Sequence, residues 1–191
     1  RTIFGNQRGI SLVEMMVSMA IFIIISGAVS GLFISGIQGQ KHTLASQRLI
    51  DQTSFALEYM SRALRMAKKD TADDGIDCIA TGSNYEVTHF GAGLKFINHL
   101  ENNDCQEFFL GGPDGDQLMQ WKNNLSEEFP LTSSKLKITS LKFNLSGESG
   151  TDLFQPKVTI ALKIRSKGSN TEENPAINIQ TTISQRNLDI Q

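Results

Sequence analysis

The sequence predicts an α+β fold, in which one long N-terminal helix packs on an antiparallel β-sheet head. Three observations support this prediction. Residues 15–37 form an uncharged run in which 16 of 23 residues are hydrophobic, compared with 39% in the whole chain. The residues that follow repeat apolar side chains at helical spacing, and no proline occurs before Pro113. Segments of the last third alternate apolar and polar residues, as strands do.

Length and charge limit the classes of protein to consider. The chain has 191 residues and a formal net charge of −2 at pH 7. This length suits one domain with an appendage and excludes a TIM barrel or a two-domain dinucleotide-binding enzyme. The weak net charge excludes a strongly basic nucleic-acid binder by composition alone, so no nucleic-acid partner is expected.

The uncharged run predicts a transmembrane helix over residues 10–38. As a helix, its 23 residues would be roughly 34 Å long, against a hydrocarbon core of about 30 Å. A cleaved secretory signal is the alternative, but such a signal has a shorter apolar run that ends in a small-residue cleavage site. A buried helix is disfavoured because the rest of the chain is too small to surround it. Arg1 and Arg8 precede the run, so the positive-inside rule predicts a cytoplasmic N-terminus.

Glu14 lies just inside the start of the apolar run. An ionised carboxylate in a membrane costs at least a few kcal/mol unless it is paired, which favours a functional role. The alternative is a carboxylate near the interface that reaches water and is stabilised by the helix N-terminus. The residue type alone leaves both interpretations open.

Residues 7–17, Gln-Arg-Gly-Ile-Ser-Leu-Val-Glu-Met-Met-Val, resemble the N-terminal signal of type IV pilins and pseudopilins. In that signal a basic leader ends in Gly, an apolar residue follows, and Glu precedes a long apolar run. The resemblance implies that a membrane-embedded prepilin peptidase cuts after Gly9 and N-methylates Ile10. One departure is Ile10 itself, since the family usually has Phe there.

This resemblance also implies a role for Glu14. Its carboxylate would pair with the new ammonium group of Ile10 on a neighbouring or the same subunit, and would set the register of assembly. Each charge is costly alone in lipid, and pairing offsets part of that cost.

The resemblance further implies a structural subunit without enzymatic activity or cofactor. Its expected parts are a basic leader (1–9), a transmembrane helix (10–38), an amphipathic stem helix (39–69) and an exported β-rich head (70–191). Expected partners are other pilin or pseudopilin subunits, the prepilin peptidase, the inner-membrane assembly platform and membrane lipid. Residues 131–132, 135–143, 155–160 and 180–188 look like minor pilins of the J/W type. The alternative is an uncleaved, single-span anchor for an exported binding module.

Small residues recur four apart along the transmembrane segment, where they form one stripe. They are Gly27, Gly31, Ser35 and Gly39. Such a stripe permits close approach of neighbouring helices. Ordinary enrichment of small residues in a membrane helix is the alternative explanation.

The stem is expected to continue the same helix, from about Ser11 to Lys69. Its apolar face repeats at intervals of three and four residues, and the charges of Lys68 and Lys69 suit a helix C-terminus. The predicted face consists of Ile50, Thr53, Leu57, Met60, Leu64 and Ala67, with Leu49, Ala56 and Ala63 beside them.

The head is expected to be mostly strands. Residues 157–165 alternate, with Val158, Ile160, Leu162 and Ile164 facing inward. Residues 135–145 change parity near Thr139, which predicts a bulge or bend. Residues 177–183 form a last strand. Two hairpins are expected, at 85–90 with 94–97 and at 108–110 with 118–121.

Cys78 and Cys105 both lie in the expected exported head. Two cysteines there predict one disulfide. Two free thiols are the main alternative. A zinc site with His89 and His99 has no recognised ligand spacing.

Clustered aspartates are weak candidates for calcium. Asp114 and Asp116 lie in a glycine-rich turn, and a second run follows the stem: Asp70, Asp73, Asp74 and Asp77. Neither run matches the spacing of an EF-hand loop, and plain turns are the alternative. No metal is therefore expected. The sequence also contains no nucleophile-elbow, zinc-protease or P-loop motif, which argues against an enzyme.

Overall fold

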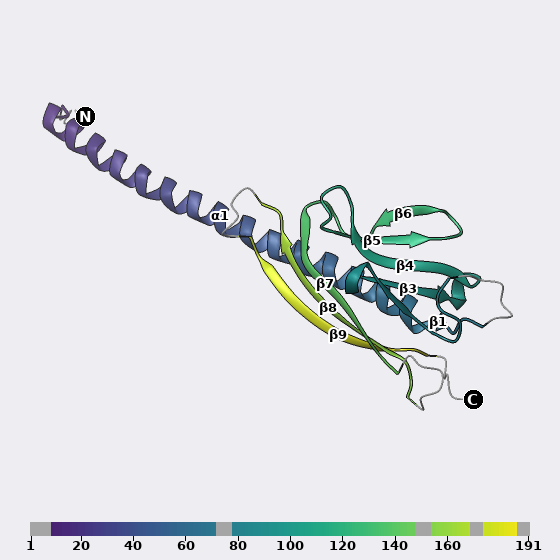
Figure 1. Ribbon diagram of the computed structural model, residues 1–191. Coiled ribbons are helices and arrows are strands. Elements are labelled where there is room, and N and C mark those ends of the chain that lie inside the picture. The colour runs from purple at the N-terminus through teal and green to yellow at the C-terminus, as the bar shows by residue number, and fades with distance from the viewer. Residues whose placement is uncertain (1–8, 72–77, 148–153, 169–173, 187–191) are drawn as a thin grey trace, which may run out of the picture. The chain divides into compact units, whose positions relative to one another are not determined.

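The computed structural model describes residues 9–71, 78–147, 154–168 and 174–186. Helix α1 (Leu12–Arg65) comes first and antiparallel strands follow it, which confirms the predicted α+β fold (Figure 1). The chain divides into two compact units, Arg1–Thr43 and Leu44–Gln191.

Helix α1 ends earlier than predicted, at Arg65 rather than at Lys69. The amide of Met66 donates to the carbonyl of Ala63 (3.1 Å), and the chain then forms β1 (Ala67–Lys68). Strand β1 pairs with β3 (Gly93–Asn98). The backbone groups predicted to continue the helix are therefore used by the sheet, a tertiary interaction that helical periodicity cannot reveal.

Tyr85 holds the end of the helix. Its hydroxyl donates to the carbonyl of Leu64 (2.7 Å), one of the last-turn carbonyls that have no partner within a helix. The side chain of Tyr85 is buried, and burial raises the pKa of its phenol. The hydroxyl therefore stays protonated and available as a donor.

The buried face of the stem is rotated slightly from the predicted one. Ile50 was expected in the core but is 51% exposed, whereas Leu49, expected beside the face, is fully buried. The buried residues of α1 are Leu49, Thr53, Ala56, Met60 and Leu64. Their spacing of four, three, four and four residues still describes one helical stripe.

Six strands form the first sheet, in the order β1-β3-β4-β5-β6 with β2 paired to β3. The predicted hairpins are confirmed as β2 (Glu86–Thr88) with β3, and β4 (Asp104–Gly111) with β5 (Gln117–Lys122). Short 3-10 helices, η1 (His89–Gly91) and η2 (His99–Glu101), lie in the connections. Strands β1 and β6 (Glu127–Pro130) were not predicted.

Three long strands form a second sheet, in the order β7-β8-β9. They are β7 (Leu136–Ser146), β8 (Lys157–Ser166) and β9 (Ala176–Ser184). The register of β7 shifts between Ile138 and Ser140, which confirms the predicted bulge. Two sheets replace the single sheet that was expected, because alternation identifies strands but not their partners.

One continuous hydrophobic cluster joins these layers. It contains the buried apolar residues of α1 together with Phe96 of β3, Phe108 of β4, Phe143 of β7 and Ile160 of β8. Within the second unit, α1 and both sheets therefore share one core.

Candidate functional site

The segment before α1 contains the predicted cleavage site. Gly9, Ile10 and Ser11 precede the first helical residue, Leu12. A Cβ atom built on Gly9 would meet no other atom within 4 Å, and Ile10 is 74% exposed. Nothing in the described part of the chain therefore requires glycine at position 9. A need for a small residue there would come from an external partner.

Glu14 lies in the first turn of α1 and is exposed. This position places its negative charge near the positive end of the helix. The carboxylate forms no ion pair with any residue that the structure describes. It is therefore available to a cation outside the chain.

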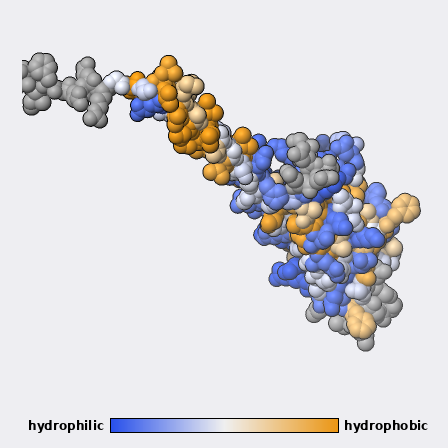
Figure 2. Space-filling model, turned by 90° about the vertical axis from the view of Figure 1, so that its left-hand side faces the viewer, coloured by the Kyte–Doolittle hydropathy of each residue, from blue (hydrophilic) through white to orange (hydrophobic). Residues whose placement is uncertain are grey.

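The first part of α1 exposes its apolar side chains. The helix is long and apolar enough to cross a membrane, and no residue of its most apolar window is buried. Figure 2 shows hydrophobic side chains gathered over this part of the helix. Phe22, Ile24 and Leu32, for example, are each at least 70% exposed. A contiguous apolar surface of this extent fits a membrane-anchored protein.

Three hydroxyl groups of this segment donate hydrogen bonds within the helix. Ser18 donates to the carbonyl of Glu14 (2.7 Å), and Ser30 donates to that of Ser26 (2.8 Å). Thr43 makes the same bond to Gly39 (3.1 Å). These bonds reduce the cost of placing a hydroxyl in lipid, where no water is present.

The small-residue stripe is open in this structure. A Cβ atom on Gly27, Gly31 or Gly39 would meet nothing within 4 Å, and Ser35 is exposed. Successive members turn about 40° around the helix, since four residues exceed one turn of 3.6. The stripe therefore winds slowly, and its packing role stays a prediction.

A comparison with protein-family models supports one of the interpretations of the N-terminal segment. The model of the prokaryotic N-terminal methylation motif matches residues 5–30. The chain carries this methylation motif. Its presence indicates a processing signal like that of type IV pilins and pseudopilins, which are structural rather than catalytic proteins. No match was found among curated proteins or among solved structures.

The methylation motif implies processing by a prepilin peptidase and assembly with other pilins. It includes Gly9, Ile10, Glu14 and one residue of the small-residue stripe, Gly27. Arg1 and the rest of the predicted leader up to Arg8 lie outside the described residues.

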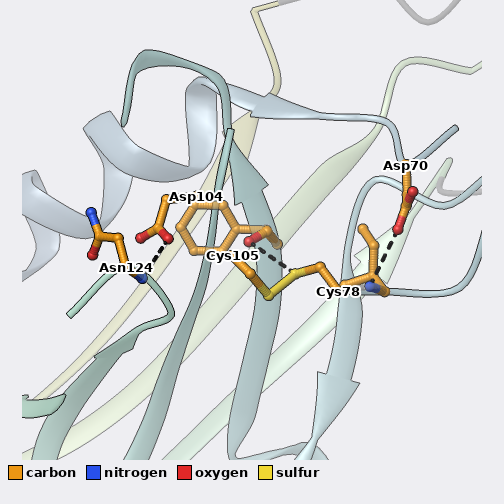
Figure 3. Close-up of a disulfide and its surroundings, with 7 residues drawn as sticks. Asp70, Cys78, Asp104, Cys105 and Asn124 are labelled. Carbon is orange, nitrogen blue, oxygen red and sulfur yellow. Dashed lines mark hydrogen bonds between the residues drawn. A yellow bond between two sulfur atoms is a disulfide. The ribbon is translucent and has the colours of Figure 1, made fainter. Parts of the chain in front are cut away.

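The predicted disulfide is present in the head. Cys78 and Cys105 are bonded, with their Cα atoms 5.7 Å apart (Figure 3). Both side chains are buried with Ile79 and Ile97, and Trp121 packs against them. The bond ties the segment after the stem to β4. The disulfide leaves no thiolate to bind zinc at the site considered from the sequence. His89, a residue of that site, instead lies 3.2 Å from Glu107.

Two aspartates hold the chain around the disulfide (Figure 3). Asp70 accepts a hydrogen bond from the amide of Ile79 (3.4 Å). Asp104 accepts one from the amide of Asn124 (2.9 Å). Asp70 was a weak calcium candidate, and the structure gives it this structural contact. The other candidates of that run, Asp73, Asp74 and Asp77, lie outside the described residues.

Asp114 and Asp116 form a site for a lysine rather than for calcium. The ammonium group of Lys167 lies 3.0 Å from a carboxylate oxygen of Asp114 and 2.8 Å from one of Asp116. Pairing with Asp116 and Asp114 raises the pKa of Lys167. Sequence reasoning missed this lysine because 51 residues separate it from Asp116. Within the described residues, no group of three or more potential metal ligands occurs.

Reduction of the disulfide is expected to destabilise the full chain by about 3 kcal/mol, because the bond closes a long loop in the unfolded state. For a domain of this size the midpoint of thermal unfolding would fall by about 6–12 °C. The measurement compares melting of the detergent-solubilised chain with and without reductant. A double variant, Cys78→Ala with Cys105→Ala, is the control and should not respond to reductant. An unchanged midpoint on reduction of the native chain would contradict a stabilising bond.

Proposed function

We propose that the chain is a structural subunit, a minor pilin or minor pseudopilin, of a type IV pilus or of a secretion or competence pseudopilus. The observation that carries this proposal is the methylation motif over residues 5–30 at the start of an exposed apolar helix. A prepilin peptidase cuts after Gly9 and methylates Ile10. The mature subunit then enters a filament through its N-terminal helix.

Glu14 sets the register of assembly in this proposal. Cleavage exposes an ammonium group on Ile10, and a carboxylate four residues later is its natural partner. Both groups are costly alone in lipid, so pairing between subunits favours assembly over dispersed monomers. The exposure of Glu14 and its lack of an ion pair within the described residues support this role.

Before assembly, the subunit lies in the cytoplasmic membrane with its head outside. The exposed apolar part of α1 supports the anchor, and the disulfide supports exposure of the head to an oxidising compartment. The small residues of the stripe allow neighbouring helices to approach closely in the filament. Partners are other subunits and the assembly platform in the membrane.

Expression in a host that contains prepilin peptidase is expected to yield a chain that begins with N-methylated Ile10. Mass spectrometry of the N-terminal peptide measures this directly, and a host without the peptidase is the control. A Gly9→Leu variant should stay uncut in both hosts, because the peptidase requires a small residue there. An intact leader on the native chain in the first host would favour an uncleaved, single-span anchor instead.

A Glu14→Gln variant is expected to be cut normally but to enter filaments at least about 10-fold less, because the loss of one paired charge in lipid costs more than about 1.4 kcal/mol. The readout is the amount of the subunit in sheared or purified filaments relative to the membrane pool. Glu58→Gln is the matched control, since Glu58 lies on the same helix and is exposed outside the apolar run. Normal incorporation of the Glu14 variant would refute the pairing role.

A further inference from the structure

The sheet of β7, β8 and β9 has an outer face that carries positive charge and no negative charge. The inner face packs into the core through Phe143, Ile160 and the other buried residues of these strands. No acidic residue occurs in any of the three strands. We call the side chains on the opposite side the basic face. Its cations are Lys137, Lys142, Lys157, Lys163 and Arg165.

The strand register places these cations close together. Lys142, Ala161 and Gln180 form one row across the sheet, and Lys163 lies in the next row between Ser140 and Asn178. Lys142 and Lys163 are therefore diagonal neighbours on adjacent strands, about 7–8 Å apart. Like charges at this spacing repel, so the arrangement does not serve the stability of the isolated head.

Most of these charges lack an internal partner. Lys137 lies 3.9 Å from Asp116, whereas Lys142, Lys157, Lys163 and Arg165 form no ion pair with any residue that the structure describes. Lys167, just after β8, differs because Asp114 and Asp116 neutralise it. The basic face is therefore a concentrated surface of unneutralised charge.

A hollow lies within the basic face. Its volume is about 320 Å³, and the small residues Ser140 and Ala161 belong to its lining. Lys163, Asn178 and Gln180 also line it. Residues with charged and with neutral hydrogen-bond donors therefore surround one depression.

The neutral residues of the basic face restrict the kind of partner. Apart from the five cations, Ala161 and Ala176, every outward residue of the three strands is Ser, Thr, Asn or Gln. Together with Lys and Arg, these are the side chains that contact phosphate oxygens and sugars in DNA complexes. The described outward positions carry no aromatic side chain. Single-stranded nucleic acids are bound by stacking on aromatic residues, and protein interfaces depend on aromatic or large apolar anchors.

We propose that the basic face binds the phosphate backbone of duplex DNA without reading its sequence. The cations extend over five rows, roughly 26 Å along the strands at 3.3 Å per residue. A duplex carries one negative charge per about 1.7 Å of its axis, so a single duplex has enough phosphates along this length to contact all five cations. The net charge of −2 does not oppose this contact, because it averages over the whole chain.

The test is fluorescence anisotropy with a labelled 30-base-pair duplex of arbitrary sequence and the full chain in nonionic detergent. Binding is expected to weaken with salt, with a slope of log K against log salt of about −4.5 for five contacts. That slope corresponds to an affinity loss of about 500-fold between 50 and 200 mM salt. Duplexes of unrelated sequence should bind alike.

A triple variant, Lys142→Gln, Lys157→Gln and Lys163→Gln, should lower the salt slope to about −1.8 because three phosphate contacts are lost. The matched control removes three exposed cations outside the basic face: Lys41→Gln, Arg48→Gln and Arg65→Gln. It has the same net charge and should retain the native slope. Circular dichroism checks that both variants are folded.

Three results would overturn the proposal. Equal losses in both triple variants would show that only net charge matters. Tighter binding of a single strand than of the duplex would indicate a stacking site instead. Tighter binding of polyglutamate with the same number of charges, under the same salt conditions, would indicate an acidic protein partner.

Discussion

Packing of one face of α1 against two sheets holds the head together. Leu49, Met60 and Leu64 are fully buried in a cluster that also contains residues of β3, β4, β5, β7, β8 and β9. Truncation of a buried Leu or Met to Ala typically costs 2–5 kcal/mol, and whole domains are stable by only about 5–15 kcal/mol. The sheets therefore depend on the helix for their shared core, and the disulfide and the Tyr85 bond only reinforce it.

The same helix meets two different environments along its length. Residues such as Ile24 and Leu32 are exposed, whereas Leu49 and Met60 are fully buried. Exposing the large apolar surface of the first part of α1 to water is unfavourable. This part of the helix therefore needs lipid or neighbouring helices around it. The bonds of Ser18 and Ser30 within the helix suit both of those surroundings. In the proposed function, the first part of the helix exchanges contacts with lipid for contacts with other subunits.

Features encoded locally were predictable, and features that depend on distant partners were not. The methylation motif, the strand alternation of β8 and the bulge of β7 are all read from consecutive residues, and the structure and the family match agree with them. Three other features depend on pairing between residues that are far apart in the sequence. They are the end of α1, the division into two sheets and the ion pair between Asp116 and Lys167. The basic face is an intermediate case. Its lysines occupy the alternate positions of strands whose apolar positions were predicted, but only the register shows that they meet on one surface.

Labelling of single cysteines is the most direct test of the central claim. That claim is that the first part of α1 lies in lipid and its later part packs in the core of the head. The native cysteines are paired, so Ile24→Cys, Asp51→Cys and Met60→Cys variants each add one free thiol. In intact membranes, a water-soluble maleimide should label position 51, which is exposed beyond the apolar run. Position 24 should be protected by lipid, and position 60 should react only after the head unfolds. Labelling of position 24 as fast as position 51 in intact membranes would contradict the account.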